Sequence, residues 1–363
     1  MKQFQVKRDD FHQHRVVDDE AAATELVDGE IRVRINRFAF TANNITYAVA
    51  GDMIGYWQFF PAVGDDAEGW GVIPVWGFAE VIDCKAEGVS VGEKLFGYFP
   101  PADELTMLPT RMSEHGFIDG AVHRSQLPAG YNRYRRVQAE AGYSASGDDE
   151  RMLLWPLYAT AFCLGDSLLD NGWYGAEQVL IISASSKTSI GLAYALRSID
   201  GAPRSVGITS SRNLDFVSSI GVYDDLCCYD DVSAIDLTKL SVIVDMSGNT
   251  AVLAALHSAL GDNMKFTVNV GLTHWEDAEP NEKINTERSE FFFAPGHIQK
   301  RSEEWGPQEF DRRSSEFVAS AADQSRSWLS LSQRGGLAGL SEIYDDVCEG
   351  RNSPQEGIVI DMS

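Results

Sequence analysis

The chain has 363 residues, of which 44% are apolar, enough to bury a large core and to suggest about two domains. Its formal net charge is −24 at pH 7, from 30 basic and 54 acidic side chains. A charge of this sign repels phosphate backbones and anionic membranes. Composition therefore argues against nucleic acid and membranes as partners.

The cysteines include no CxxC pair, which argues against a disulfide framework and against a structural zinc lobe. The first 15 residues, MKQFQVKRDDFHQHR, lack the apolar stretch of a signal peptide. No apolar run approaches the roughly 18 residues needed to span a bilayer. We therefore expect a cytoplasmic protein. The cysteines are Cys84, Cys163, Cys227, Cys228 and Cys348.

Residues 1–150 are predicted to be mostly β. Apolar side chains alternate or run together in EIRVRINRFAF from Glu30, PVWGFAEVIDC from Pro74 and VGEKLFGYFP from Val91, which is typical of strands. The polar stretch SASGDDE, which ends at Glu150, then predicts a connection between domains.

From residue 151 to 327 the pattern changes to strands that alternate with helices such as TSIGLAYALR and TAVLAALHSAL. This alternation predicts an α/β domain of the Rossmann type, a doubly wound parallel sheet with helices on both faces. The run FFFA at Phe291 could add a sixth, edge strand. Residues 328–363 predict a helix, LAGLSEIYDDVCEG, and a final strand, IVIDM, that returns to the first domain. The five principal strands are expected at residues 179–183, 206–209, 226–229, 242–246 and 266–271.

The segment VLIISASSKTSIGLAYALR, from Val179, has the strand, loop and helix start that a dinucleotide pyrophosphate needs, because free N–H groups and the helix dipole favour an anion there. The usual glycine fingerprint is missing: Gly191 remains, and serines stand where glycines are expected. The alternative is a polar turn with a helix-capping serine. The loop residues predicted to bind the coenzyme are Ser185, Ser186, Lys187, Thr188 and Ser189.

The end of the second strand favours NADP(H) over NAD. NAD-binding folds place an acidic residue there, whereas this chain has Thr209, Ser210, Ser211 and Arg212. Hydroxyl groups and a guanidinium suit the 2′-phosphate of NADPH. The alternative is that these residues only cap the next helix.

An NTPase is an alternative interpretation, because SSKTS followed by VIVDMS imitates a phosphate-binding loop and a metal-binding aspartate. The glycines of a GxxxxGK loop do not precede Lys187, and that loop needs their backbone freedom. We therefore prefer the dinucleotide interpretation.

The ends of the fourth and fifth strands supply a second set of candidates. Parallel strands end at the same edge of a sheet, so these residues are expected to hold the ribose and the nicotinamide amide. For the first three residues a helix cap is an equal alternative. The candidates are Ser247, Gly248, Asn249, Val270, Gly271 and Leu272.

Four segments, in order along nearly the whole chain, resemble the medium-chain dehydrogenase/reductase superfamily, in particular its zinc-independent quinone oxidoreductases and enoyl reductases. They are FAFTANNITYAVAGD, WGVIPVWGFAEVIDCKAEGVSVGEKLFGYF, LLWPLYATAFCLGDSLL and the helix, turn and IVIDM ending. The resemblance implies a GroES-like catalytic domain, formed by residues 1–150 and completed by 328–363. It also implies an NADP-binding domain at 151–327 and an active site in the cleft between them.

Catalytic zinc would need Cys, His and carboxylate ligands in the first domain. The corresponding places read TANNI and WGFAEV, and His115 and His123 lie in a loop-like segment. We therefore predict a zinc-independent enzyme. Without a Lewis acid, the expected reaction is hydride transfer from NADPH to an activated C=C, quinone or ketone.

Tyr47, with Asn43 or Asn44 beside it, is the candidate donor to the substrate oxygen and a candidate proton source. The alternative is a packed tyrosine with a satisfied hydroxyl. Aromatic residues predict an apolar wall for a small hydrophobic or aromatic substrate, although core packing explains some of them equally well. They are Tyr56, Trp57, Phe59, Phe60 and Trp76.

Three further possibilities stay open. Arg133, Arg135 and Arg136 could receive an anionic substrate tail, but a solvated face with ion pairs is favoured. The FFFA edge strand could pair two copies into a homodimer. The alternative to an enzyme is a non-catalytic NADPH-binding sensor or structural protein with the same fold.

Overall fold

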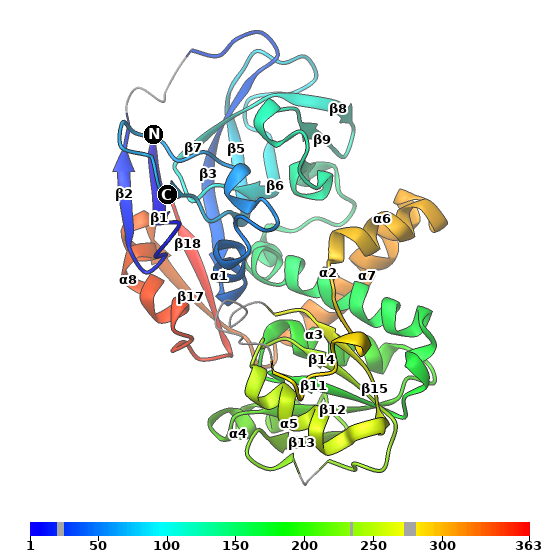
Figure 1. Cartoon of the computed structure of the whole chain (residues 1–363). Coiled ribbons are helices and arrows are strands. Elements are labelled where there is room, and N and C mark those ends of the chain that lie inside the picture. Colours follow the sequence, from blue (N-terminus) through cyan, green and yellow to red (C-terminus); the bar gives the residue numbers. More distant parts are fainter. Residues whose placement is uncertain (20–24, 233–234, 272–280) are drawn as a thin grey trace. The chain divides into compact units, whose positions relative to one another are not determined.

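The computed structural model describes residues 1–19, 25–232, 235–271 and 281–363 (Figure 1). The chain forms two compact units. The first contains Met1–Leu153 and Ser330–Ser363, and the second contains Leu154–Leu329. The division falls inside the long helix α2 (Asp148–Asp170).

The first unit is built from two β-sheets. In β3 the side chains of Ile31, Val33 and Ile35 are buried, as the alternating pattern predicts. The smaller sheet has the order β2 (His14–Asp18), β1 (Lys2–Lys7), β4 (Trp70–Gly71). The larger has the order β17 (Ser330–Gly335), β18 (Glu356–Asp361), β3 (Ile31–Phe40), β5 (Val75–Cys84), β6 (Lys94–Phe99), β10 (Arg133–Arg136), β9 (Gly116–Asp119), β8 (Pro109–Ser113), with β7 (Glu104–Met107) also paired to β3.

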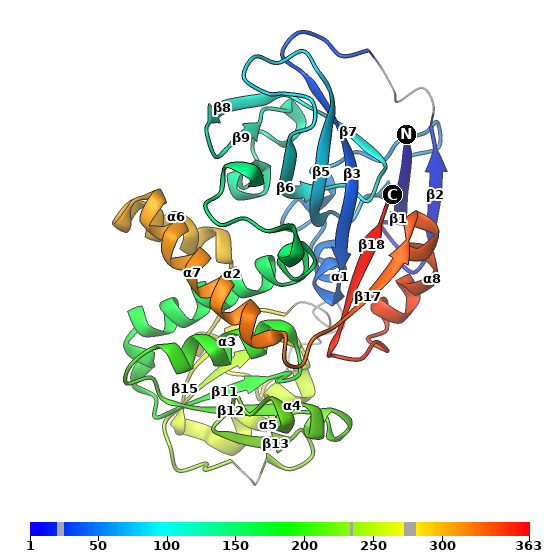
Figure 2. The same ribbon diagram turned by 180° about the vertical axis from the view of Figure 1, so that it is seen from behind.

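The C-terminal segment takes part in the larger sheet of the first unit. Its strand β18 pairs antiparallel with β3, so that Ile360 lies opposite Phe38. Helix α8 (Gly336–Cys348) buries Leu340 and Tyr344. Figure 2 shows β17, β18 and β3 side by side. Strand β17 was not predicted from the sequence. The remaining helical elements that bear on the site are α1 (Ala42–Val49), η2 (Tyr56–Gln58) and η4 (Ala129–Asn132).

The second unit holds a parallel sheet of six strands. Its chain starts at the centre, moves to one edge and then returns to the other side of β11, which is the doubly wound order of a Rossmann-type sheet. All neighbouring strands are parallel, so the predicted fold class is confirmed. The order is β13 (Asp225–Cys228), β12 (Arg204–Thr209), β11 (Gln178–Ile182), β14 (Ser241–Asp245), β15 (Met264–Asn269), β16 (Ser289–Phe291).

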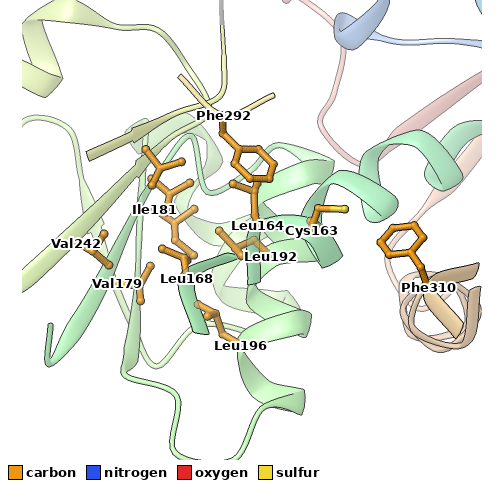
Figure 3. Packing of buried hydrophobic residues seen from close by; sticks show 13 residues of the cluster. Cys163, Leu164, Leu168, Val179, Ile181, Leu192, Leu196, Val242, Phe292 and Phe310 are labelled. Atoms are coloured by element: carbon orange, nitrogen blue, oxygen red, sulfur yellow. The ribbon is translucent and has the colours of Figure 1, made fainter. Parts of the chain in front are cut away.

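Helices cover both faces of this sheet. Val179 and Ile181 of β11 pack in one buried cluster with side chains of α2 and α3, while Leu180 packs in a second cluster with Leu256 of α5. Figure 3 shows the first cluster. Burial on both faces explains why β11 is a continuous apolar run. The remaining helices are α3 (Lys187–Ser198), α4 (Leu214–Ile220), α5 (Thr250–Leu260), α6 (Ala294–Trp305) and α7 (Pro307–Ser325).

Helix α2 is a longer apolar segment than any predicted from the sequence. Within residues 145–170, it is long and apolar enough to cross a membrane by length and composition alone, and 56% of its most apolar window is buried inside the fold. Cys163, Leu164 and Leu168 pack in the same cluster as β11 and α3 (Figure 3). Its apolar composition is therefore accounted for by core packing.

Candidate nucleotide and substrate sites

The loop after β11 bends sharply at Ser183. This residue has φ +65°, in the left-handed region that glycine adopts most easily. The Ser186 N–H donates to the Ser183 carbonyl at 2.8 Å, and the Ala184 N–H donates to the Ile208 carbonyl at 3.0 Å. The serine-rich loop thus makes the kind of turn for which the glycine fingerprint of dinucleotide-binding loops uses glycine. With serine at this position, the backbone is strained.

Helix α3 begins directly after this turn. Ser186 is its N-cap, because its Oγ accepts the Ser189 N–H at 3.2 Å and its hydroxyl donates to Ser189 Oγ at 2.8 Å. The helix-capping alternative is therefore present in the structure. Lys187 and Thr188 lie in the first turn, where N–H groups and the helix dipole favour an anion. In the described part of the chain, the Thr188 hydroxyl has no hydrogen-bond partner.

Ser185 joins the loops that follow β11 and β12. Its buried Oγ accepts the Asn213 amide at 3.0 Å and the Thr209 hydroxyl at 3.4 Å. Ser210 and Ser211 follow Thr209, and across the described ranges their hydroxyls have no hydrogen-bond partner. The structure thus brings the first two predicted groups together at the carboxyl ends of adjacent strands.

Arg212 adds a cation to the loops that follow β11 and β12, residues 183–189 and 209–213, which are here called the corner. It is exposed and lies in a short 3₁₀ turn, η8 (Ser211–Asn213). The chain has Thr209 at the end of β12, where NAD-binding folds place a carboxylate. The corner therefore carries hydroxyl groups and a guanidinium.

Tyr229 belongs to the same corner and was missed by the sequence analysis. Its N–H donates to the Thr209 carbonyl at 2.9 Å. Burial raises the pKa of its phenol, while a hydrogen bond with Ser183 and the charge of Arg212 act in the opposite direction. The available signal was its position one residue after β13, because parallel strands end at the same edge of the sheet.

The turn after β14 is organised by the buried carboxylate of Asp245. Its Oδ1 accepts the N–H groups of Ser247 at 2.8 Å and Gly248 at 3.2 Å, together with the Ser247 hydroxyl at 2.7 Å. Asn249 caps α5 by accepting the Ala251 N–H at 3.1 Å. The helix-cap alternative therefore describes Asn249, and the coenzyme role of these three residues stays a prediction.

The ends of β14 and β15 lie close together. The N–H groups of Val270 and Gly271 donate to the Asp245 carbonyl at 2.8 and 3.1 Å. A Cβ placed on Gly271 would lie 2.2 Å from the Met246 carbonyl oxygen, so no larger residue fits without movement. Leu272, the last coenzyme candidate, lies outside the described residues.

Asn44, a substrate-site candidate in the first unit, is engaged within the fold. Its Oδ1 accepts the Thr41 N–H at 2.8 Å in a capping box of α1, and its amide donates to the Pro74 carbonyl at 2.9 Å. These bonds fix α1 to the segment that leads into β5. The geometry favours a positioning role for Asn44 over direct contact with substrate.

Tyr47 is buried and lies beside its predicted partner Asn43. Its oxygen accepts the Trp76 indole N–H at 3.4 Å and is also in hydrogen-bonding contact with the Asn43 side chain. Burial, followed by the proximity of Tyr131, raises the pKa of Tyr47 well above its usual value. The phenol therefore stays protonated near neutral pH and can act as a hydrogen-bond donor.

Tyr47 is part of a group of rings, here called the tyrosine cluster: Tyr47, Tyr56, Tyr98, Tyr131 and Trp76. Ring centroids are 4.6 Å apart for Tyr47 and Tyr56, 4.8 Å for Tyr98 and Tyr131, and 5.2 Å for Tyr98 and Trp76. Tyr98 and Tyr131 were not predicted. The signal for Tyr98 was its register opposite Trp76 in the pairing of β5 with β6.

The other predicted wall residues pack in the interior. Trp57, Phe59 and Phe60 are buried, and the Trp57 ring lies directly against Gly51 and Gly71, where no Cβ would fit. The core-packing alternative therefore accounts for Trp57.

Two of the three arginines of YNRYRRV form local ion pairs. Arg135 pairs with Glu140 at 3.8 Å, and Arg136 pairs with Glu93 at 3.1 Å. Arg133 is exposed, whereas the side chains of Arg135 and Arg136 are mostly shielded and already paired, which argues against a substrate-anion site at these two arginines.

His123 is also engaged locally, because its Nε2 contacts the Phe59 carbonyl at 3.0 Å. Across the described ranges, no group of three or more His, Cys, Asp or Glu side chains could hold a metal ion. Independence from zinc remains a prediction.

A comparison with known protein families identifies the family to which this sequence belongs. Residues 38–353 match the model of the family described as "Protein of unknown function (DUF2855)". The chain belongs to this family. A search of curated protein sequences finds no match for this DUF2855 member.

Several solved structures have the same fold as this chain. CurA of Vibrio vulnificus in complex with NADPH has a TM-score of 0.65 at 13% identity, covering 100% of this chain and 99% of that chain. Mycobacterial Rv1454c complexed with NADPH has a TM-score of 0.60 at 13% identity, and a mutant enoyl thioester reductase of Candida tropicalis has 0.59 at 11%, both covering 100% of each chain. The resemblance to medium-chain dehydrogenases/reductases is confirmed at the level of the fold.

Proposed function

We propose that this DUF2855 protein is a zinc-independent, NADPH-dependent oxidoreductase that transfers hydride to an activated C=C, quinone or ketone. The observation that carries the proposal is the carboxyl edge of the parallel sheet in the second unit. There a helix N-terminus, several hydroxyl groups and Arg212 lie beside a strand that ends in Thr209. NADPH in the CurA and Rv1454c structures supports the same choice of coenzyme.

The donor set at this edge fits an NADPH molecule. The first turn of α3 and the Thr188 hydroxyl suit the pyrophosphate, while Ser210, Ser211 and Arg212 suit the 2′-phosphate. Asp245, at the end of β14, already accepts three bonds from its own turn. When bound, the coenzyme supplies the hydride.

The substrate is assigned to the tyrosine cluster of the first unit. Tyr47 keeps its proton, receives a hydrogen bond from Trp76 and is left with its own O–H to donate. A neutral phenol polarises a carbonyl less strongly than a metal ion does, so acceptors that are already conjugated or otherwise activated suit it best.

The reaction is tested by following NADPH oxidation with a panel of quinones, enals and enoyl thioesters. The wild type should oxidise NADPH with at least one acceptor. Tyr47→Phe should lower kcat by about 100-fold, the usual contribution of a positioned acid, with NADPH affinity unchanged. Full turnover by Tyr47→Phe would remove this residue from the chemistry.

A non-catalytic NADPH-binding protein is the second candidate, and the strained serine turn at Ser183 favours it. Such a protein would bind NADPH but would not oxidise it with any acceptor of the panel. Steady-state turnover by the wild type would rule this candidate out.

A further inference from the structure

The hydroxyl of Tyr98 is a buried polar group in the interior of the first unit. The residue is fully buried on β6, and among the residues that the structure describes its hydroxyl has no hydrogen-bond partner. A buried hydroxyl without a partner destabilises a fold, and native proteins leave few of them. The exception calls for a physical reason.

The Tyr98 side chain cannot easily turn to reach another partner. Its ring packs against Tyr131 at 4.8 Å and Trp76 at 5.2 Å, and meets the rings of Phe59 and Tyr47 edge-on at 5.4 and 5.6 Å. The backbone carbonyl of Tyr98 accepts the Tyr134 hydroxyl at 2.5 Å. The strand and the ring are therefore held in place, and with the ring the position of the hydroxyl oxygen.

The Tyr98 hydroxyl interacts with the oxygen of Tyr47, as the Asn43 side chain does, but among the described residues its contact does not have the geometry of a hydrogen bond. Burial, followed by the proximity of Tyr47, raises the pKa of Tyr98 well above its usual value, and burial does the same for Tyr47. Both phenols therefore keep their protons near neutral pH. Trp76 donates to Tyr47, so each phenol still has an O–H to give.

Two neighbouring O–H donors are complementary to a single acceptor atom. A carbonyl oxygen has two lone pairs and can accept both bonds without bringing a charge into a buried site. A carboxylate would need a cation, and the buried Arg124 nearby, which contacts the Tyr134 hydroxyl, is already paired with Asp119. The half-buried rings of Trp76 and Tyr131 offer flat faces for a conjugated skeleton.

We propose that the hydroxyl groups of Tyr98 and Tyr47 together bind the oxygen of an uncharged, conjugated carbonyl compound, whose planar part packs against Trp76 and Tyr131. This inference rests on the proposed function and narrows its substrate class. Tyr98 is a substrate-binding residue in this account, and its hydroxyl finds its partner in the ligand.

The test measures binding to the full-length protein without NADPH. The probes are trans-4-phenyl-3-buten-2-one, an uncharged aryl enone, and trans-cinnamate, its carboxylate counterpart. Calorimetry should show wild-type binding of the enone, at least about tenfold weaker binding of cinnamate, and about three- to tenfold weaker enone binding by Tyr98→Phe. Tyr143→Phe, which removes a phenol of the same unit that bonds to Asp148, is the matched control and should bind like the wild type.

Two further readouts separate a ligand-binding role from a structural one. The infrared C=O stretch of the bound enone should move to higher frequency in Tyr98→Phe, because one hydrogen bond to the oxygen is lost. The Tm of unliganded Tyr98→Phe should equal or exceed that of the wild type, since a hydroxyl without a partner is removed. A lowered Tm would show that the hydroxyl is satisfied inside the fold and would overturn the inference.

The inference also fails if the wild type does not bind the enone, or if Tyr98→Phe leaves both affinity and C=O frequency unchanged. Failure of the proposed function looks different. In that case the enone still binds through Tyr98, but NADPH is not oxidised with any acceptor.

Discussion

Gly271 shows how strongly a single residue can constrain the nucleotide edge of the sheet. Gly271→Ala should lower the free energy of unfolding by about 2 kcal/mol, because the new methyl group would meet the backbone of Met246 rather than a movable side chain. Urea denaturation measures the change. Gly296→Ala, in helix α6 with nothing within 4 Å of the new Cβ, is the control and should be neutral or stabilising by up to about 1 kcal/mol. Equal stability of Gly271→Ala and the wild type would mean that the two strand ends can separate freely.

Single-residue roles were the hardest part to predict from the sequence. The residue types in the loops suggested polar contacts, but the partners came from other strands. Ser185 is used by Asn213 and Thr209, and Asn44 is used by Thr41 and Pro74. A sequence pattern cannot show which hydroxyl or amide is already hydrogen-bonded to a distant segment. It therefore could not show that the Ser185 hydroxyl is engaged within the fold while the Ser210 hydroxyl, among the described residues, has no partner.

At the scale of elements, His257 links helix α5 to β15 and to the segment that precedes β16. Its Nδ1 accepts the Asn285 N–H at 3.0 Å, so the neutral ring carries its proton on Nε2 and donates to Thr267 Oγ1 at 2.9 Å. Protonation would place a second N–H against the Asn285 donor. Burial likewise lowers the pKa of His257 below its ordinary value of 6.5.

This depressed pKa predicts a pH-dependent stability. As pH falls below about 6.5, the unfolded chain takes up a proton at His257 before the folded protein does, so the free energy of unfolding decreases. The contribution of this residue is present above that pH and is lost at up to about 1.4 kcal/mol per pH unit. Denaturant unfolding of wild type and His257→Gln between pH 7.5 and 5 should show a steeper loss in the wild type. Parallel curves would contradict the assignment.

Elements with a strong apolar period were predicted, and those without one were missed. The central strands of the second unit and helices α3, α5 and α8 followed their patterns. Helix α7 buries Ser314 and Ser325 along with Phe310 and Val318, so small polar residues hide its helical period. Strand β17 is largely exposed, which leaves its sequence, SLSQRG, without the apolar alternation of a core strand.

At the scale of the whole molecule, the order of elements carried more information than any motif. Alternating strands and helices predicted the doubly wound sheet although the glycine fingerprint is missing, and the fold neighbours share only 11–13% of residues with this chain. The strand order then collects the loops after β11, β12 and β13 at one edge. The backbone bend at Ser183 could be found only in three dimensions, whereas the position of Tyr229 directly after β13 was a signal that the sequence offered.

The choice of coenzyme tests the account most directly. Calorimetric titration of the wild type with NADPH and NADH should show a preference for NADPH of at least about tenfold, since a charge-assisted contact to the 2′-phosphate contributes about 1.5–3 kcal/mol. Arg212→Glu should abolish or invert this preference while leaving NADH binding in place. NADPH affinity that is unchanged in Arg212→Glu, or no binding of either coenzyme to the wild type, would contradict the account.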